Sequence, residues 1–248
     1  MKKSTKKLLY QTVSHRKWPL PVKRWSYYQE WNKALFLHWK VPADTLQQLL
    51  PSGLTLDTFE NEAWISIVAF TMEKIRPKNL PSFSPVSHFH EINIRTYVIH
   101  NGKPGVYFLN IEAEKQLSAV ISKMLSGLPY EKAKMKRNHQ NEIQTYSSNQ
   151  KKKGFEFAAN YQVSNNTISK SELDLWLTER YCLYLDKGEK NYLYEIHHLP
   201  WELQEVRISD IHTNYQIGSI DLNRKPDLIH YSKGIDVIAW KKELLKSK

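Results

Sequence analysis

The sequence predicts a mainly β protein, with a few short helices around one curved antiparallel sheet. Tyr and Trp are numerous, at 14 and 8 residues, whereas only 8 of the 248 residues are glycine. Aromatic and β-branched residues favour strands, and the scarcity of glycine argues against a glycine-rich nucleotide-binding fold. Hydrophobic residues make up 41% of the chain, which is enough for one sizeable core. Many strands with few helices favour a closed or strongly curved sheet.

The first third of the chain contains two strand patterns and a short helix. Residues 34–41, ALFLHWKV, and residues 62–75, EAWISIVAFTMEKI, are apolar and rich in aromatic and β-branched residues, as in buried strands. Between them, PADTLQQLLPSGL predicts a short helix that ends at Pro51. Residues 75–91 hold prolines and serines, which indicate a loop.

A β-hairpin is predicted for residues 91–114, EINIRTYVIHNGKPGVYFLNIEAE, with its turn at Asn101 and Gly102. Alternate residues of a strand share a face. The polar face of the first arm comprises Glu91, Asn93, Arg95 and Tyr97. Such a row belongs either to a half-exposed strand or to the lining of a cavity. In a cavity, a buried Glu–Arg pair would bind an anionic or carbonyl-bearing ligand and shift the carboxyl pKa.

The rest of the chain continues this pattern of strands and short helices. Apolar residues at helical spacing within residues 114–126 predict a helix that ends at Gly127. Residues 141–163 predict a hairpin with a lysine run at its tip, and SKSELDLWLTER predicts a helix capped by Ser171. Four further strands are predicted in RYCLYL, NYLYEIHHL, WELQEVRISDI and IDVIAW.

Metal and cysteine chemistry find little support in the sequence. SHFHE and EIHHLPW each contain two histidines, but no third ligand stands at a telling distance, so we predict neither a metal site nor a cofactor. Since neighbouring strand residues face opposite ways, at most one of His197 and His198 faces a cavity. The single cysteine, Cys182, lies in a strand pattern and is expected to be a buried, inert thiol. Arg180 is either a structural ion-pair partner or an anion-binding arm.

The net charge of +11 is concentrated in a few segments. Residues 1–24 carry eight Lys or Arg and no acid, and more lysines stand at 151–153 and 241–248. Nucleic-acid surfaces usually place such charge on a structured face, so nucleic acid is not the expected partner, although a tail interaction with an anionic surface stays open. We predict a flexible basic tail at residues 1–17 and a single domain at residues 18–248. No apolar run is long enough to span a bilayer and no secretory signal is present, so we expect a cytoplasmic protein.

Several segments together resemble one family. In chain order they are WNKALFLHW, LLPSGLTLDTF, AWISIVAF, FHEINIRTYV, GKPGVYFLNIEA, GLPYEKAKM, LTERYCLY and IHHLPWELQ. They resemble the YqjF-like proteins, a bacterial family whose domain has no assigned function, over roughly residues 18–240. That family is placed in the acetoacetate decarboxylase-like superfamily. The resemblance therefore implies a cone-shaped β-barrel with a central cavity and peripheral helices.

The same resemblance argues against decarboxylation through an amine. Acetoacetate decarboxylases form a Schiff base on a lysine whose pKa is lowered by a second lysine and by burial. The matching turn here, at Leu128 and Pro129, is followed by Tyr130, and Lys132 and Lys134 are out of register. The acidic residue of those enzymes aligns with Glu91, whereas their substrate-binding arginine has no clear counterpart.

The predicted function is the binding of a small acidic or carbonyl-bearing molecule in the cavity. The candidate site residues are Glu91, Arg95, Tyr97 and Tyr130, with Asn93 and Arg180 behind them. One alternative is an enzyme in which Glu91 is the acid/base, Arg95 anchors the substrate and Tyr130 donates a hydrogen bond. A second alternative is binding of an anionic surface or nucleic acid through the basic tails. Assembly into a homo-oligomer is left open.

Overall fold

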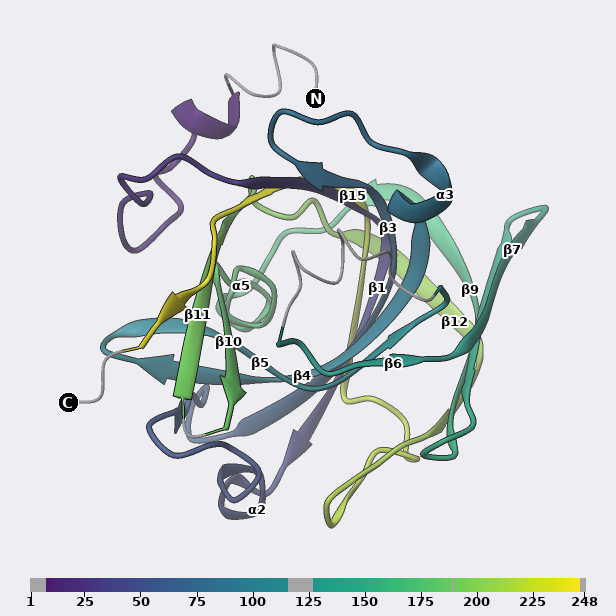
Figure 1. Ribbon diagram of the computed structural model, residues 1–248. Coiled ribbons are helices and arrows are strands. Elements are labelled where there is room, and N and C mark those ends of the chain that lie inside the picture. Colours follow the sequence, from purple (N-terminus) through teal and green to yellow (C-terminus); the bar gives the residue numbers. More distant parts are fainter. Residues whose placement is uncertain (1–7, 116–126, 189, 246–248) are drawn as a thin grey trace.

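The computed structural model describes residues 8–115, 127–188 and 190–245, and its main feature is a curved sheet of 14 strands (Figure 1). The sheet order is β16-β11-β10-β5-β4-β3-β1-β15-β12-β9-β8-β7, with β2 beside β4 and β6 beside β5, and β13 and β14 form a separate ribbon. The strands are β1 (Tyr27–Val41), β2 (Thr55–Leu56), β3 (Ala63–Pro77), β4 (Phe89–His100), β5 (Lys103–Ala113), β6 (Tyr130–Lys132), β7 (Lys134–Gln140), β8 (Ile143–Gln150), β9 (Phe155–Thr167), β10 (Cys182–Lys187), β11 (Lys190–His197), β12 (Gln204–Asn214), β13 (Gln216–Ile217), β14 (Ile220–Asp221), β15 (Leu228–Ala239) and β16 (Glu243–Leu244).

The predicted strands and hairpins are confirmed, but the sheet is a curved one and not a closed barrel. It curls far enough for β11 to pair with β15 at two positions, Ile196 with Ala239 and His197 with Ile238. The strands from β12 to β7 continue beyond that contact, so the sheet keeps free edges. The sheet is also mixed rather than purely antiparallel, because β5 runs parallel to both β6 and β10.

Short helices accompany the sheet, as predicted. Within the described residues they include α2 (Ala43–Gln47), α3 (Ser84–Ser87) and α5 (Glu172–Thr178), and α3 interrupts the segment expected to be a loop. Ser171 caps α5 through a capping box with Asp174, which confirms the predicted cap. Figure 1 shows α5 inside the curve of the sheet. The helix predicted before Gly127 lies outside the described residues, and none of the described helices is long and apolar enough to cross a membrane.

Both faces of the central strands are buried, and a bulge in β1 decides which of its residues face which side. Lys33 has a positive φ of 53° and adds one residue to β1 opposite β3. Gln29 and Trp31 before the bulge therefore share a side with Ala34 and Phe36 after it. Opposite the bulge, Gly234 has a φ of 150°, and a Cβ there would collide with the Asn32 side chain.

The N-terminal segment from residue 8 packs against the sheet, in contrast to the flexible tail expected for residues 1–17. Leu9 is 1% exposed and lies in an apolar cluster with Trp25. The guanidinium of Arg16 donates to the carbonyl of Ile196 at 2.7 Å and forms an ion pair with Glu195. Residues 8–17 thus belong to the folded body, because Leu9 is buried and the positive charge of Arg16 is paired with Glu195.

Candidate ligand-binding site

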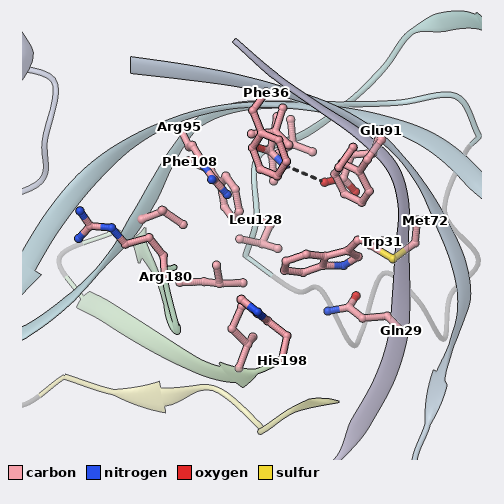
Figure 2. Close-up of a pocket in the computed structure, with 18 of the residues that line it drawn as sticks. Gln29, Trp31, Phe36, Met72, Glu91, Arg95, Phe108, Leu128, Arg180 and His198 are labelled. Carbon is pink, nitrogen blue, oxygen red and sulfur yellow. Dashed lines mark hydrogen bonds between the residues drawn. The ribbon is translucent and has the colours of Figure 1, made fainter. Parts of the chain in front are cut away.

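A cavity of about 50 Å³ lies inside the curve of the sheet, against the predicted polar face of β4 (Figure 2). Strands β1, β3, β4, β5, β10 and β11 form its walls, together with Leu128, Tyr130 and the residues around the end of α5. The side chains that line it are mostly apolar, as is usual for small-molecule sites. Its polar lining residues are Gln29, Glu91, Asn93, Arg95, Thr178, Arg180 and His198. The aromatic residues Trp31, Tyr130 and Trp201, which each carry one polar group, also line it.

Glu91 is a buried carboxyl group in the wall of this cavity. It is 3% exposed, and burial raises its pKa to about 7. Tyr130 donates its hydroxyl to Glu91 Oε2 at 2.9 Å, and Asn93 Nδ2 approaches Glu91 Oε1 at 3.4 Å. Both contacts favour the charged form, but burial outweighs them. Glu91 can therefore hold or release a proton near neutral pH.

Arg95 is a buried guanidinium that pairs with no carboxylate among the residues that the structure describes. It is 7% exposed, and burial lowers its pKa. Its Nη2 donates to the carbonyl of Leu177 at 3.4 Å and the guanidinium also interacts with the Tyr97 side chain, while Nε is buried without a partner among the described residues. Phe36 lies beside it, with the guanidinium carbon 5.7 Å from the ring centroid. A buried cation is stabilised by an anion close to it, and the described residues provide no carboxylate partner for Arg95.

Arg180 is a structural ion-pair partner, which is one of the two roles that the sequence left open, and its side chain also lines the cavity. It forms an ion pair with Asp57 at 2.5 Å, and its Nε donates to the carbonyl of Trp176 at 2.6 Å. Its guanidinium stacks over the ring of Trp176 at 4.2 Å. Nη2 remains buried without a partner, and the side chain lines the cavity. The arginine is therefore neutralised by Asp57 but keeps a donor for a ligand.

Tyr97 lies behind the cavity wall and not in it. Its hydroxyl is 2.6 Å from Ser66 Oγ and donates to the carbonyl of Leu177 at 3.1 Å. The ring packs against Trp176, with centroids 4.5 Å apart. Of the predicted site residues, Tyr97 alone is absent from the lining, and its contacts support Arg95 and Arg180 from behind.

Gln29, Trp31 and His198 also line the cavity, although the sequence did not single them out as site residues. The sequence does not predict that Gln29 and Trp31 share a face with Phe36, because the bulge at Lys33 breaks the two-residue period of the strand. His198 faces the cavity, whereas the neighbouring His197 turns away to the carbonyl of Leu9, as strand alternation predicts. Burial lowers the pKa of His198, which favours the neutral ring.

The cavity wall contains buried polar atoms that have no hydrogen-bond partner among the described residues. They are Arg95 Nε, Arg180 Nη2, Trp31 Nε1, Asn93 Oδ1 and Gln29 Oε1. Unpartnered buried groups are rare because each costs free energy. Figure 2 shows the two arginines on one side of the cavity, with Glu91, Trp31 and Gln29 on the other. Three of these five atoms are donors, two of them on arginines, so the wall suits a ligand with acceptor oxygens.

Among the described residues, the cavity lining includes no lysine and no cluster of metal ligands. The described residues contain no cluster of three or more His, Cys, Asp or Glu side chains that could hold a metal ion. Lys132 and Lys134 are exposed on β6 and β7 and do not line the cavity. Cys182 is buried outside the cavity wall, and burial raises its thiol pKa to about 12, as expected for an inert cysteine.

The comparisons with known proteins decide the family. Residues 28–236 match the family DUF2071, which is described as an uncharacterized conserved protein. The chain belongs to the DUF2071 family. One relative is the uncharacterized protein YqjF of Bacillus subtilis (strain 168), which is 39% identical over 221 residues, or 87% of this chain and 91% of that protein. The YqjF-like resemblance of the sequence is thereby confirmed.

Solved structures place this DUF2071 chain in the acetoacetate decarboxylase-like fold. It resembles an acetoacetate decarboxylase from Legionella pneumophila, with a TM-score of 0.61, 14% identity and 93% coverage of both chains. An acetoacetate decarboxylase-like enzyme from Sphingomonas wittichii RW1 has a TM-score of 0.60 at 15% identity, over 95% of this chain and 99% of that one. The enduracididine biosynthesis enzyme MppR complexed with pyruvate has a TM-score of 0.60 at 10% identity, over 93% of both chains. Identities this low establish the fold alone.

Proposed function

We propose that this DUF2071 protein binds a small organic acid, whose carboxylate lies against Arg95. The observation that carries the proposal is the buried Arg95 guanidinium, which has no carboxylate partner among the described residues and an Nε donor without an acceptor. A carboxylate would neutralise the charge and accept from the free donors of Arg95 and Arg180. Two acceptor oxygens on one group match the planar fork of a guanidinium.

The charges around the cavity also favour an anion. Arg180 is balanced by Asp57, and burial lowers the pKa of His198, which favours the neutral ring. Glu91, with a pKa of about 7, is largely protonated under slightly acidic conditions. Under those conditions the charge of Arg95 makes the net charge of the cavity lining positive. Two structural neighbours support this ligand class through their own chemistry, one complexed with pyruvate and another named for acetoacetate.

Turnover of the acid is a second candidate function, and Glu91 is the observation that favours it. A carboxyl group with a pKa of about 7 can both accept and donate a proton at neutral pH. Tyr130, which donates to Glu91 at 2.9 Å, would hold that carboxyl in place. Because Lys132 and Lys134 are exposed, this chemistry would proceed without a Schiff base on either lysine. The cytoplasmic location expected from the sequence is part of the same proposal.

Calorimetry and thermal shift with acetate, propionate, pyruvate and acetoacetate at pH 6 test the proposal. We expect at least one acid to bind and to raise the melting temperature. Arg95→Met should weaken that binding about 30-fold or more, since hydrogen bonds to a charged group contribute about 2 kcal/mol or more. Arg24→Met, which removes the same charge from an exposed position, is the matched control.

Two results would overturn the proposal. One is that none of these acids binds, and the other is that binding survives Arg95→Met unchanged. NMR spectra of each bound acid over several hours separate a binder from an enzyme, because only an enzyme consumes its ligand. Loss of consumption in Glu91→Gln with binding retained would assign the acid/base role to Glu91.

A further inference from the structure

A second, smaller cavity adjoins the ligand-binding cavity. It has a volume of about 30 Å³ and shares Gln29, Leu128, Leu183 and Ile196 with the first. Its remaining lining residues are Tyr27, Ile75, Tyr194 and Ala239. They come from β1, β3, β11 and β15. Because four side chains line both cavities, the two hollows are neighbouring parts of one interior.

The two cavities differ in polarity. Glu91, Arg95 and Arg180 all line the first cavity, and none of the three lines the second. Aliphatic side chains, two tyrosine rings and one glutamine line the second cavity. Such a space gives no compensation for a buried charge, but it gains free energy when apolar groups fill it. A ligand that occupied both parts would need a charged end and an apolar end.

We propose that the ligand is a monocarboxylic acid with a short aliphatic tail. This inference rests on the proposed function, since it takes the carboxylate to lie against Arg95. From there the tail passes between Leu128 and Leu183 and ends in the second cavity, near Ala239. Figure 2 shows Leu128 between the arginines and the side that carries Trp31 and Gln29. A dicarboxylate would place its second charge among apolar side chains and is therefore excluded.

The affinity of a homologous series of acids tests this inference. Acetate, propionate, butyrate, pentanoate and hexanoate are titrated into the full-length protein at pH 6. We expect the dissociation constant to fall about fourfold for each added methylene until the second cavity is full. Succinate, which has the carbon count of butyrate, should bind more weakly than butyrate.

Ala239→Leu is the matched variant, because Ala239 lines only the second cavity. The added side chain should fill the second cavity and so abolish the gain in affinity from added methylenes, each of which contributes about 0.8 kcal/mol when buried. Acetate has no tail to reach this cavity, so its affinity should stay within about twofold of the wild type. Ile75→Phe fills the same cavity from β3 and gives a second test if the first variant is unstable.

The outcomes separate this inference from the proposed function. If acetate binds through Arg95 but chain length has no effect on affinity, the tail site is wrong and the acid site stands. If the gain with chain length persists in both cavity-filling variants, the tail lies elsewhere and the inference is also wrong. If no acid of the series binds to the wild type, both proposals fail together.

Discussion

Glu91 and Glu112 are two buried carboxyl groups on neighbouring strands, and they differ in what surrounds them. They are 3% and 0% exposed, and burial raises the pKa of each to about 7. In the register of β4 and β5, Glu112 lies opposite Ile92, so the two carboxyl groups occupy opposite faces of the same hairpin. The first lines the ligand-binding cavity, while the second lines neither cavity.

The surroundings of Glu112 form a buried polar cluster that borders neither cavity. Ser148 donates to Glu112 Oε2 at 2.5 Å, and the neighbouring Asn110 accepts from Lys153 at 2.6 Å. Aromatic side chains of the main apolar cluster, including Tyr215, surround these groups. A raised carboxyl pKa therefore reports burial and does not by itself mark a binding site. Glu91 is distinguished by the cavity that it lines.

The largest expected effect is on the pH dependence of stability, and it should be alike for both carboxyl groups. Each folded pKa of about 7 exceeds the ordinary value of 4.5, so the folded state binds more protons between these pH values. Stability is therefore fully present below about pH 4.5 and is lost as pH rises through 7. Each carboxyl group should cost the wild type about 3 kcal/mol of its free energy of unfolding between pH 4.5 and pH 8. Glu91→Gln and Glu112→Gln should each be spared the loss that comes from the replaced group.

Urea denaturation of the wild type and both variants across this pH range measures that effect. Glu142→Gln, at an exposed position, serves as the control and should follow the wild type. An equal loss of stability in the wild type and in Glu112→Gln would show that the carboxyl group of Glu112 is not held protonated by burial.

A smaller effect should separate the two carboxyl groups through ligand binding. Ionised Glu91 repels an anion in the same cavity, so the affinity for the tightest-binding acid should fall as pH rises above 7, up to about tenfold per pH unit. Glu112→Gln should keep this fall, and Glu91→Gln should remove it. Titrations at pH 6, 7 and 8 measure the difference. The same fall in Glu91→Gln would mean that another group controls the affinity.

The smallest effect concerns the hydroxyl group that supports Glu91. The hydrogen bond from Tyr130 to Glu91 Oε2 lowers the pKa of that carboxyl group. Tyr130→Phe removes this hydrogen bond and should therefore raise the pKa of Glu91. The pH at which the affinity for the acid falls should then move upward. The loss of stability should be about 1 kcal/mol, the usual contribution of one hydrogen bond. Ser148→Ala makes the matching change at Glu112 and should alter stability without moving the binding profile. A binding profile that stays in place in Tyr130→Phe would separate Tyr130 from the titration of Glu91.

The sequence alone determined the features that depend on local spacing. The two-residue period of a strand placed Glu91, Asn93 and Arg95 on one face, and all three line the cavity. The Asn101-Gly102 turn and the Ser171 cap were likewise evident, because turns and caps depend on a few consecutive residues. The acetoacetate decarboxylase-like fold followed from the family resemblance, which the relatives confirm.

The tertiary structure decided which of these faces borders a ligand site. Asn110 and Glu112 share one face of the hairpin, and Glu91 lies on the other face. The strand period cannot show which of the two faces borders a cavity. That depends on distant segments, namely α5, Leu128 and β11 on one face and β8 on the other. The bulge at Lys33, which brings Gln29 and Trp31 into the cavity, breaks the period on which the sequence argument rests. A cavity is a property of what packs across a strand, and residues far apart in the chain supply that packing.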